Sequence, residues 1–367
     1  MEEIEMKKIL SILLVLILII SSFAVSYGGE AATEKPDIKI IIDGVRGTYS
    51  NTPIIVSGRT LLPLRELLVN LGVPNDDQHI IWNGAEKSVT VIKDATQLYL
   101  KVGSTSAKVN NSDAALDAAP VNYKGSVYIP ARFVGEAFGK VVVWDGIAQR
   151  VYMKDKTEFN EIKNLLESSV AKMDGLKRYK ENFNFSFNVM TDSGEDNSYS
   201  TETSGFTDNE NKTVNWIMNF GTYQTNMYVT NHILYQKDTI DNEWSKEELT
   251  ENDFNDYFEI QELGDVLYAA LSIDKTAGNN LVTLEGNVSL DYFQNTDKTI
   301  QPDFDECKGE ITIDNTTGYI TKIYSYERFR ETPDGEEPNT VEYIFNYEVS
   351  DFNGNFSTEL PQELSDL

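Results

Sequence analysis

The chain has 367 residues, 40% of them hydrophobic, and a formal net charge of −28. This apolar share is enough for packed cores, which excludes a disordered chain. Residues 37–155 contain 13 Lys/Arg and 12 Asp/Glu, a net of +1, whereas residues 156–367 contain 15 Lys/Arg and 42 Asp/Glu, a net of −27. Such a charge step predicts a domain boundary. An acidic domain repels phosphate backbones, so we expect no nucleic-acid partner.

The first residues predict export. A pair of lysines precedes an apolar run from Ile9 to Ile20, and Ala24-Val25-Ser26 fits a cleavage site. A helix of this length spans about 18 Å, short of the roughly 30 Å hydrocarbon core of a membrane. We therefore predict a signal peptide at residues 1–26, a linker at 27–36 and an extracellular or cell-surface location. If the segment is not cleaved, it anchors the protein in the membrane instead.

Two stretches within residues 37–155 are copies of each other. The first, Gly58–Arg65, reads GRTLLPLR, and the second, Gly125–Arg132, reads GSVYIPAR. Each copy then reaches a tryptophan, Trp82 or Trp144, with a valine seven positions further on. A repeat of this size is one supersecondary unit used twice.

This double motif resembles the copper amine oxidase N-terminal domain, also called the stalk domain, which is common on exported proteins of Firmicutes. The resemblance covers about residues 37–155 and implies a module that is not the catalytic part of an amine oxidase. Enzymes of that class need three His ligands for copper, and this chain has two His in total. Asn346-Tyr347-Glu348 matches the short motif of their quinone cofactor, but it lies in an alternating run typical of a half-buried strand. We therefore expect no enzyme, no cofactor and no copper site.

Each copy predicts a strand, a tight turn, a strand, a helix and a further strand. Pro63 and Pro130 fit the first turn of a helix, because the N–H group that proline lacks would have no partner within the helix there. Gly72 and Gly139 follow at positions where helices commonly end.

Two further residue types recur in both copies. Arg65 and Arg132 lie at the same place in the two predicted helices, where they fit either recognition of a carboxylate or glycan or a structural ion pair between helix and sheet, and we favour the ion pair. Trp82 and Trp144 are interpreted as core anchors, each leading through a turn into a strand.

The acidic half begins with a predicted bridging helix over residues 156–180, because apolar residues recur at steps of three and four and Asp155 or Thr157 fits the N-cap. The period then changes to two: Phe183, Phe185 and Phe187 alternate with Asn and Ser, which predicts a strand with an aromatic face. Further strands are predicted at Tyr199–Phe206, Val214–Phe220, Tyr223–Val229, Ile233–Lys237, Val282–Tyr292, Lys308–Ile313, Tyr319–Glu327 and Val341–Val349, with one or two helices between Phe254 and Leu271. This order favours one large antiparallel sheet.

The element order, with Tyr228–Lys237 before Trp244-Ser245-Lys246 and the ending Thr358-Glu359-Leu360-Pro361, resembles the LolA/LppX-like lipoprotein-carrier fold over about residues 157–367. In that fold a curved half-barrel holds acyl chains or another apolar ligand against covering helices. The expected fold class is therefore α+β, mainly antiparallel β: a small two-repeat α+β stalk domain followed by a curved antiparallel half-barrel with packed helices, the acidic β-rich domain at residues 181–367.

Two functions remain open. In the first, an exported, non-catalytic envelope or surface protein binds a hydrophobic or lipidic ligand in its half-barrel, with Phe185, Trp216 and Phe345 lining the cavity, because ligand clefts are mostly apolar and aromatic. The alternative is a structural or adhesive protein that contacts a cell-wall component and has no small-molecule ligand, in which case the same residues form a packed core. Neither the ligand nor the oligomeric state follows from the sequence.

The remaining chemistry-bearing residues suggest no reaction. The acidic loops lack the spacing of a calcium loop, so we expect a solvated acidic surface and no metal site. Cys307 is the lone cysteine, which fits a reactive thiol, an intermolecular bridge or an incidental surface residue, and we favour the last. His232 is interpreted as an exposed residue of a hairpin turn.

Overall fold

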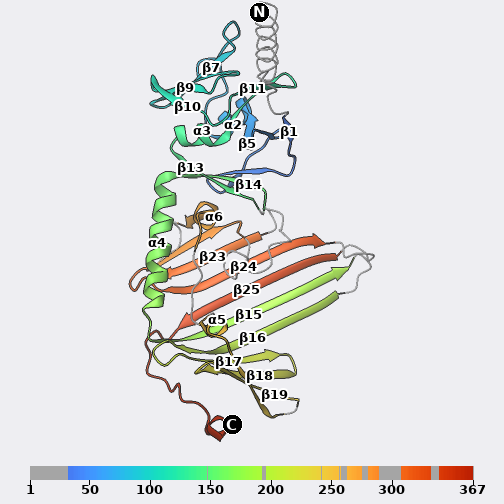
Figure 1. Ribbon diagram of the computed structural model, residues 1–367, viewed down its shortest axis with the longest axis vertical. Helices are drawn as coiled ribbons and strands as arrows, with labels where there is room; N and C mark the ends of the chain where they lie inside the picture. Colours follow the sequence, from blue (N-terminus) through green and yellow to red (C-terminus); the bar gives the residue numbers. More distant parts are fainter. Residues whose placement is uncertain are drawn as a thin grey trace, which may run out of the picture.

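The computed structural model (Figure 1) describes residues 32–366 apart from 147, 192–195, 241, 256, 258–262, 275–279, 289–306 and 332–338. The signal peptide predicted at residues 1–26 lies outside the described residues. The described part is a mainly antiparallel β fold, with three small sheets in the N-terminal part and a large curled sheet in the C-terminal part. Within it, no helix is both long and apolar enough to cross a membrane.

The N-terminal part places two short helices, α2 (Leu64–Asn70) and α3 (Ala131–Ala137), against small sheets. The strand order of the first sheet is β1 (Thr33–Glu34), β4 (Ile54–Val56), β5 (Arg59–Pro63), β12 (Ser126–Pro130) and β11 (Val121–Tyr123). The order of the second is β10 (Ser112–Ala115), β9 (Ser106–Val109), β8 (Thr96–Lys101), β7 (Ser88–Lys93) and β6 (Ile80–Asn83). The order of the third is β13 (Lys140–Asp145), β14 (Arg150–Asp155), β2 (Lys39–Ile42) and β3 (Val45–Arg46).

Both short helices begin and end where the sequence predicts. Pro63 and Pro130 are the N-cap residues, with φ of −56° and −60°, close to the angle that the proline ring imposes. Gly72 and Gly139 follow the helices with φ of +82° and +76°, a conformation that glycine adopts without a Cβ clash. The apolar faces of the two helices enter one buried core together with residues of β2, β7 and β8.

The bridging helix is α4 (Lys156–Asp174), which ends six residues before the predicted boundary because the next strand already begins at Arg178. Asp155 is the N-cap, as one of the two predicted alternatives: its Oδ1 accepts hydrogen bonds from the backbone N–H of Thr157 at 2.9 Å and of Glu158 at 3.2 Å. Figure 1 shows α4 running beside the large sheet, where it contacts the strands β21 (Leu271–Asp274) and β24 (Ile320–Glu331).

The large sheet has eleven described strands, and every neighbouring pair is antiparallel, which confirms the predicted single antiparallel sheet. Their order is β20 (Trp244–Glu248), β19 (Ile233–Asp238), β18 (Tyr223–Thr230), β17 (Thr213–Phe220), β16 (Asp196–Asp208), β15 (Arg178–Thr191), β25 (Asn339–Ser350), β24 (Ile320–Glu331), β23 (Cys307–Asp314), β22 (Leu281–Gly286) and β21 (Leu271–Asp274). Strands β20 and β21 were not expected from the sequence. Residues 289–292, in the strand predicted at Val282–Tyr292, lie outside the described residues.

Short helices α5 (Glu251–Asn255) and α6 (Asp265–Ala270) lie between β20 and β21. Helix α6 packs against both β13 and β14, and Ile41 and Tyr152 of the N-terminal part belong to the same buried cluster as α4, α6 and the sheet. Lys154 of β14 is buried and donates from Nζ to Ser272 Oγ of β21 at 2.6 Å. The N-terminal part and the large sheet therefore share a packed junction, with Asp155 at the point where β14 passes into α4.

Candidate functional site

The three residues predicted to line a cavity lie on one face of the large sheet. Phe185 on β15 is paired directly with Phe345 on β25, so both side chains point to the same side. Trp216 on β17 joins them, because its ring meets that of Phe183 at 5.7 Å between centroids. On the same side, Val349 belongs to the buried cluster that contains residues of α4, and Trp216 packs against the cluster that contains Phe254 of α5. We call this side the inner face.

Five aromatic side chains lie near one another on the inner face, and we call them the aromatic band: Phe185, Phe187, Phe329, Tyr343 and Phe345. Ring centroids of Phe187 and Tyr343 are 4.8 Å apart, those of Phe329 and Tyr343 5.5 Å, and those of Phe185 and Tyr343 5.8 Å. All five side chains are only partly buried. On β15 and β25 the outer face carries the alternating residues, mostly Asn, Ser and Glu, so on these two strands the aromatic side chains gather on the inner face and the polar ones mostly on the outer face.

A buried carboxylate at the start of β15 was not anticipated from the sequence. Glu181 is 4% exposed and accepts hydrogen bonds from Thr207 Oγ1 at 2.7 Å, from Trp216 Nε1 at 2.8 Å and from Tyr347 Oη at 2.9 Å. Burial, reinforced by the Glu181 charge, holds the pKa of Tyr347 well above its usual value. The available signal was the charged residue at the head of the alternating aromatic run, which the sequence analysis did not use.

A glycine makes the contact between Glu181 and Trp216 possible. Gly205 on β16 lies between them, paired with Glu181 on one side and with Trp216 on the other. A Cβ at Gly205 would lie 2.9 Å from Trp216 Cδ1 and 1.8 Å from the backbone oxygen of Asn215. The indole therefore crosses β16 above a residue without a side chain and reaches the carboxylate two strands away.

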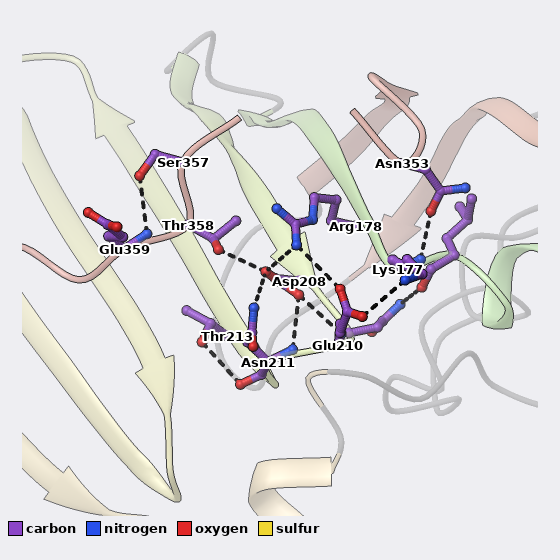
Figure 2. A network of polar contacts seen from close by, with 12 residues as sticks. Lys177, Arg178, Asp208, Glu210, Asn211, Thr213, Asn353, Ser357, Thr358 and Glu359 are labelled. Carbon is purple, nitrogen blue, oxygen red and sulfur yellow. Dashed lines mark hydrogen bonds and ion pairs between the residues drawn. The ribbon is translucent and has the colours of Figure 1, made fainter. Parts of the chain in front are cut away.

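A second polar network fixes the end of the sheet near the C-terminal segment (Figure 2). Asp208 is fully buried and accepts hydrogen bonds from the backbone N–H of Glu210 and of Asn211, from Asn211 Nδ2 and from Thr358 Oγ1. Burial would raise the pKa of Asp208, but these hydrogen bonds and the Arg178 guanidinium outweigh it, so the pKa lies below its usual value. The network ties the chain after β25 to the turn between β16 and β17, which is a structural role.

Several side chains lie where the sequence analysis did not expect them. Trp82 and Trp144 are not core anchors, since they are 46% and 39% exposed. Arg65 forms no ion pair within the described residues and donates from Nη1 to Asn75 Oδ1 at 2.7 Å, while Arg132 is exposed with neither a hydrogen bond nor an ion pair there. The local pattern placed each residue on the right element, but burial depends on what packs against that element.

Cys307 is buried at the start of β23, so the prediction of a surface cysteine is wrong. Lys308, the next residue on β23, is exposed on the other side of the alternating strand, so a charged neighbour in sequence is a poor guide to the exposure of Cys307. His232 lies in the turn between β18 and β19 with φ of +63°, as predicted for a hairpin turn, and its ring stacks on Phe254 at 4.1 Å.

The site offers apolar surface rather than a set of reacting groups. Within the described residues, no cluster of three His, Cys, Asp or Glu side chains could hold a metal ion. Tyr347 of the short Asn-Tyr-Glu sequence lies on β25, as its alternating neighbours predict, and its hydroxyl is engaged by Glu181.

Several solved structures match more than half of this chain at low sequence identity. They include a DUF1329 family protein from Desulfovibrio piger (9% identity, TM-score 0.21, covering 55% of this chain and 95% of that one). A putative outer membrane lipoprotein-sorting protein domain from Vibrio parahaemolyticus has 9% identity and a TM-score of 0.24, with 56% and 95% covered. A LolA superfamily protein from Nitrosomonas europaea has 10% identity and a TM-score of 0.18, with 54% and 96% covered.

No curated protein matches the chain. Its N-terminal part does match a family model: residues 41–153 fit the copper amine oxidase N-terminal domain. This confirms the resemblance that the two motifs indicated, for a segment that begins in β2 and ends in β14.

Proposed function

We propose that the chain is an exported, non-catalytic cell-envelope or surface protein whose large sheet binds a hydrophobic or lipidic ligand on its inner face. The observation that carries this proposal is the aromatic band, in which the rings of Phe185, Phe187 and Phe329 each meet that of Tyr343 while all five members stay partly exposed. A filled core packs at the density of an organic crystal and leaves such rings buried. Ligand sites, in contrast, are concave and lined by aromatic side chains.

The three predicted residues have distinct roles in this proposal. Phe185 and Phe345 form the floor of the site, because they are paired across β15 and β25. Trp216 forms the wall toward α5, where its ring lies 5.7 Å from that of Tyr257. Its hydrogen bond to Glu181 fixes the indole edge and leaves the apolar ring faces for contacts. The predicted division into a signal peptide, a stalk domain at residues 37–155 and a ligand-binding domain at 181–367 belongs to the same proposal.

Titration of the mature chain with cis-parinaric acid, a fatty acid that fluoresces in apolar surroundings, tests the site. We expect a saturable increase in fluorescence for the wild type. Phe345→Ala removes one aromatic contact worth about 1.5–3 kcal/mol, so the Kd should rise about tenfold to a hundredfold. Ile344→Ala is the matched control, because Ile344 is the next residue on the same strand and points to the outer face.

The structural alternative gives the opposite pattern. If the aromatic band is packed core, Phe345→Ala should cost about 3–5 kcal/mol of unfolding free energy. Absence of a saturable site together with a stability loss of that size would replace the ligand-binding proposal with a structural or adhesive role in the envelope.

A further inference from the structure

The N-terminal part contains two clefts lined by corresponding residues of the two sequence motifs. The first has a volume of about 610 Å³ and is lined, among others, by Pro63, Arg65, Trp82, Val89, Ser126 and Val127. The second has a volume of about 300 Å³ and is lined, among others, by Pro130, Arg132, Trp144, Val151, Arg59 and Thr60. In each cleft, one motif supplies the proline before the helix, the arginine and the tryptophan. The other motif supplies the first residues of its strand.

The pairing of β5 with β12 explains this exchange. Leu62 is the direct partner of Ile129, which occupies the corresponding position in the second motif. Their neighbours are exchanged in the same way, since Leu61 pairs with Pro130 and Pro63 with Tyr128. Antiparallel pairing of corresponding residues creates a local two-fold axis between β5 and β12. This axis relates one cleft to the other.

Both tryptophans are held in their clefts although they are exposed. Trp82 pairs with Val89 across one hairpin, and Trp144 pairs with Val151 across another. In each case a glycine lies two residues later: a Cβ at Gly84 would lie 3.5 Å from Trp82 Nε1, and one at Gly146 3.3 Å from Trp144 Nε1. Each indole thus rests against its own turn, so an apolar ring surface is presented to solvent at the same place in both clefts.

An arginine with unused hydrogen-bond donors accompanies each indole. Arg65 donates one hydrogen bond, to Asn75, and Arg132 none within the described residues. A guanidinium has five N–H donors and binds carboxylates with two parallel hydrogen bonds. The flat indole suits the apolar face of a sugar ring, because an aromatic side chain offers a large, rigid contact surface. Residues 37–155 carry a net charge of only +1. The carboxylates that line the clefts have partners in the protein, since Glu66 accepts from Ser50 N–H and Asn51 Nδ2 and Asp117 pairs with Arg59.

We propose that these two clefts are equivalent binding sites for a carboxylate-bearing polysaccharide, with a sugar ring on each tryptophan and a carboxylate on each arginine. A glycan strand has a direction, and two sites related by a two-fold axis bind strands that run in opposite directions. They therefore hold two strands, or two segments, of a glycan network rather than successive units of one strand. This inference is independent of the ligand proposed for the inner face, because it uses other residues of another part of the chain.

Co-sedimentation of the mature chain with purified, protein-free peptidoglycan sacculi, in which sugar rings and carboxylates occur together, provides the test. We expect the wild type to sediment with the sacculi. Trp82→Ala and Trp144→Ala should each weaken binding at least about tenfold, because two-site attachment exceeds single-site affinity by about 10²–10⁴. Arg65→Gln and Arg132→Gln, which change exposed side chains and spare the core, should do the same. Trp244→Ala, in β20 of the large sheet, is the control and should bind like the wild type.

A second arm tests the carboxylate. Amidation of the sacculi with carbodiimide and methylamine removes their negative charge and should reduce binding of the wild type to the level of the Arg65→Gln/Arg132→Gln double variant. Binding that survives amidation would show that the arginines do not bind carboxylates of the polysaccharide. Failure of the wild type to sediment, or full binding by the Trp82→Ala/Trp144→Ala double variant, would overturn the proposal as a whole.

Discussion

Replacement of Gly205 by alanine should separate the strands that support the inner face. The added Cβ would lie 1.8 Å from the backbone oxygen of Asn215, whereas ordinary contacts of this kind lie at roughly 3.5 Å. The neighbouring group is backbone, so it cannot swing away as a flexible side chain would. Strand β17 must move outward by more than about 1 Å, and Trp216 must leave its position above β16.

The cost follows from the contacts that this movement breaks. The ladder between β16 and β17 loses its hydrogen bonds near Gly205, each worth about 0.5–1.5 kcal/mol, and the bond from Trp216 Nε1 to the Glu181 carboxylate is worth about 1.5–3 kcal/mol. We therefore expect Gly205→Ala to lower the unfolding free energy by about 3–5 kcal/mol. The loss of the Trp216 anchor should also weaken binding of cis-parinaric acid.

Urea unfolding followed by tryptophan fluorescence measures this effect. Gly264→Ala is the matched control, because a Cβ at Gly264 meets no atom within 4 Å and its φ of −110° suits any residue. Its stability should stay within about 1 kcal/mol of the wild type, because the change costs no more than the preference for glycine over alanine at the N-cap of α6. If the two alanine variants unfold at the same urea concentration, the packing argument for Gly205 and Trp216 is wrong.

Two further predictions concern the caps and networks around the sheet. Because the pKa of Asp208 is lowered in the folded state, its contribution to stability is present above the unfolded value of about 3.9 and is lost as the pH falls through the folded pKa. Asp208→Asn should therefore be less stable than the wild type by about 1–3 kcal/mol at pH 7, with a gap that narrows below about pH 4 in urea titrations. Asp155→Ala removes the N-cap of α4 and should cost about 1 kcal/mol in the same assay, whereas Asp155→Ser should restore most of it.

Much of the fold follows from local patterns. The alternation from Phe183 onward placed the aromatic side chains of β15 on one face, because successive residues of a strand point to opposite sides. The N-cap of α4 and the prolines that precede α2 and α3 could also be predicted, since caps and fixed φ angles act within a few residues. These features need no knowledge of what lies across from them.

The contacts between distant segments could be found only in the tertiary structure. Nothing local to β15 indicates that β25 lies beside it, or that Trp216 reaches Glu181 across Gly205, because the energies that decide these pairings come from residues far apart in the chain. The exposure of Trp82 and Trp144 and the burial of Cys307 have the same origin. The sequence by itself determined which residues share a strand face or a helix end, whereas the packing of elements against one another decided which of those faces are covered and which stay exposed.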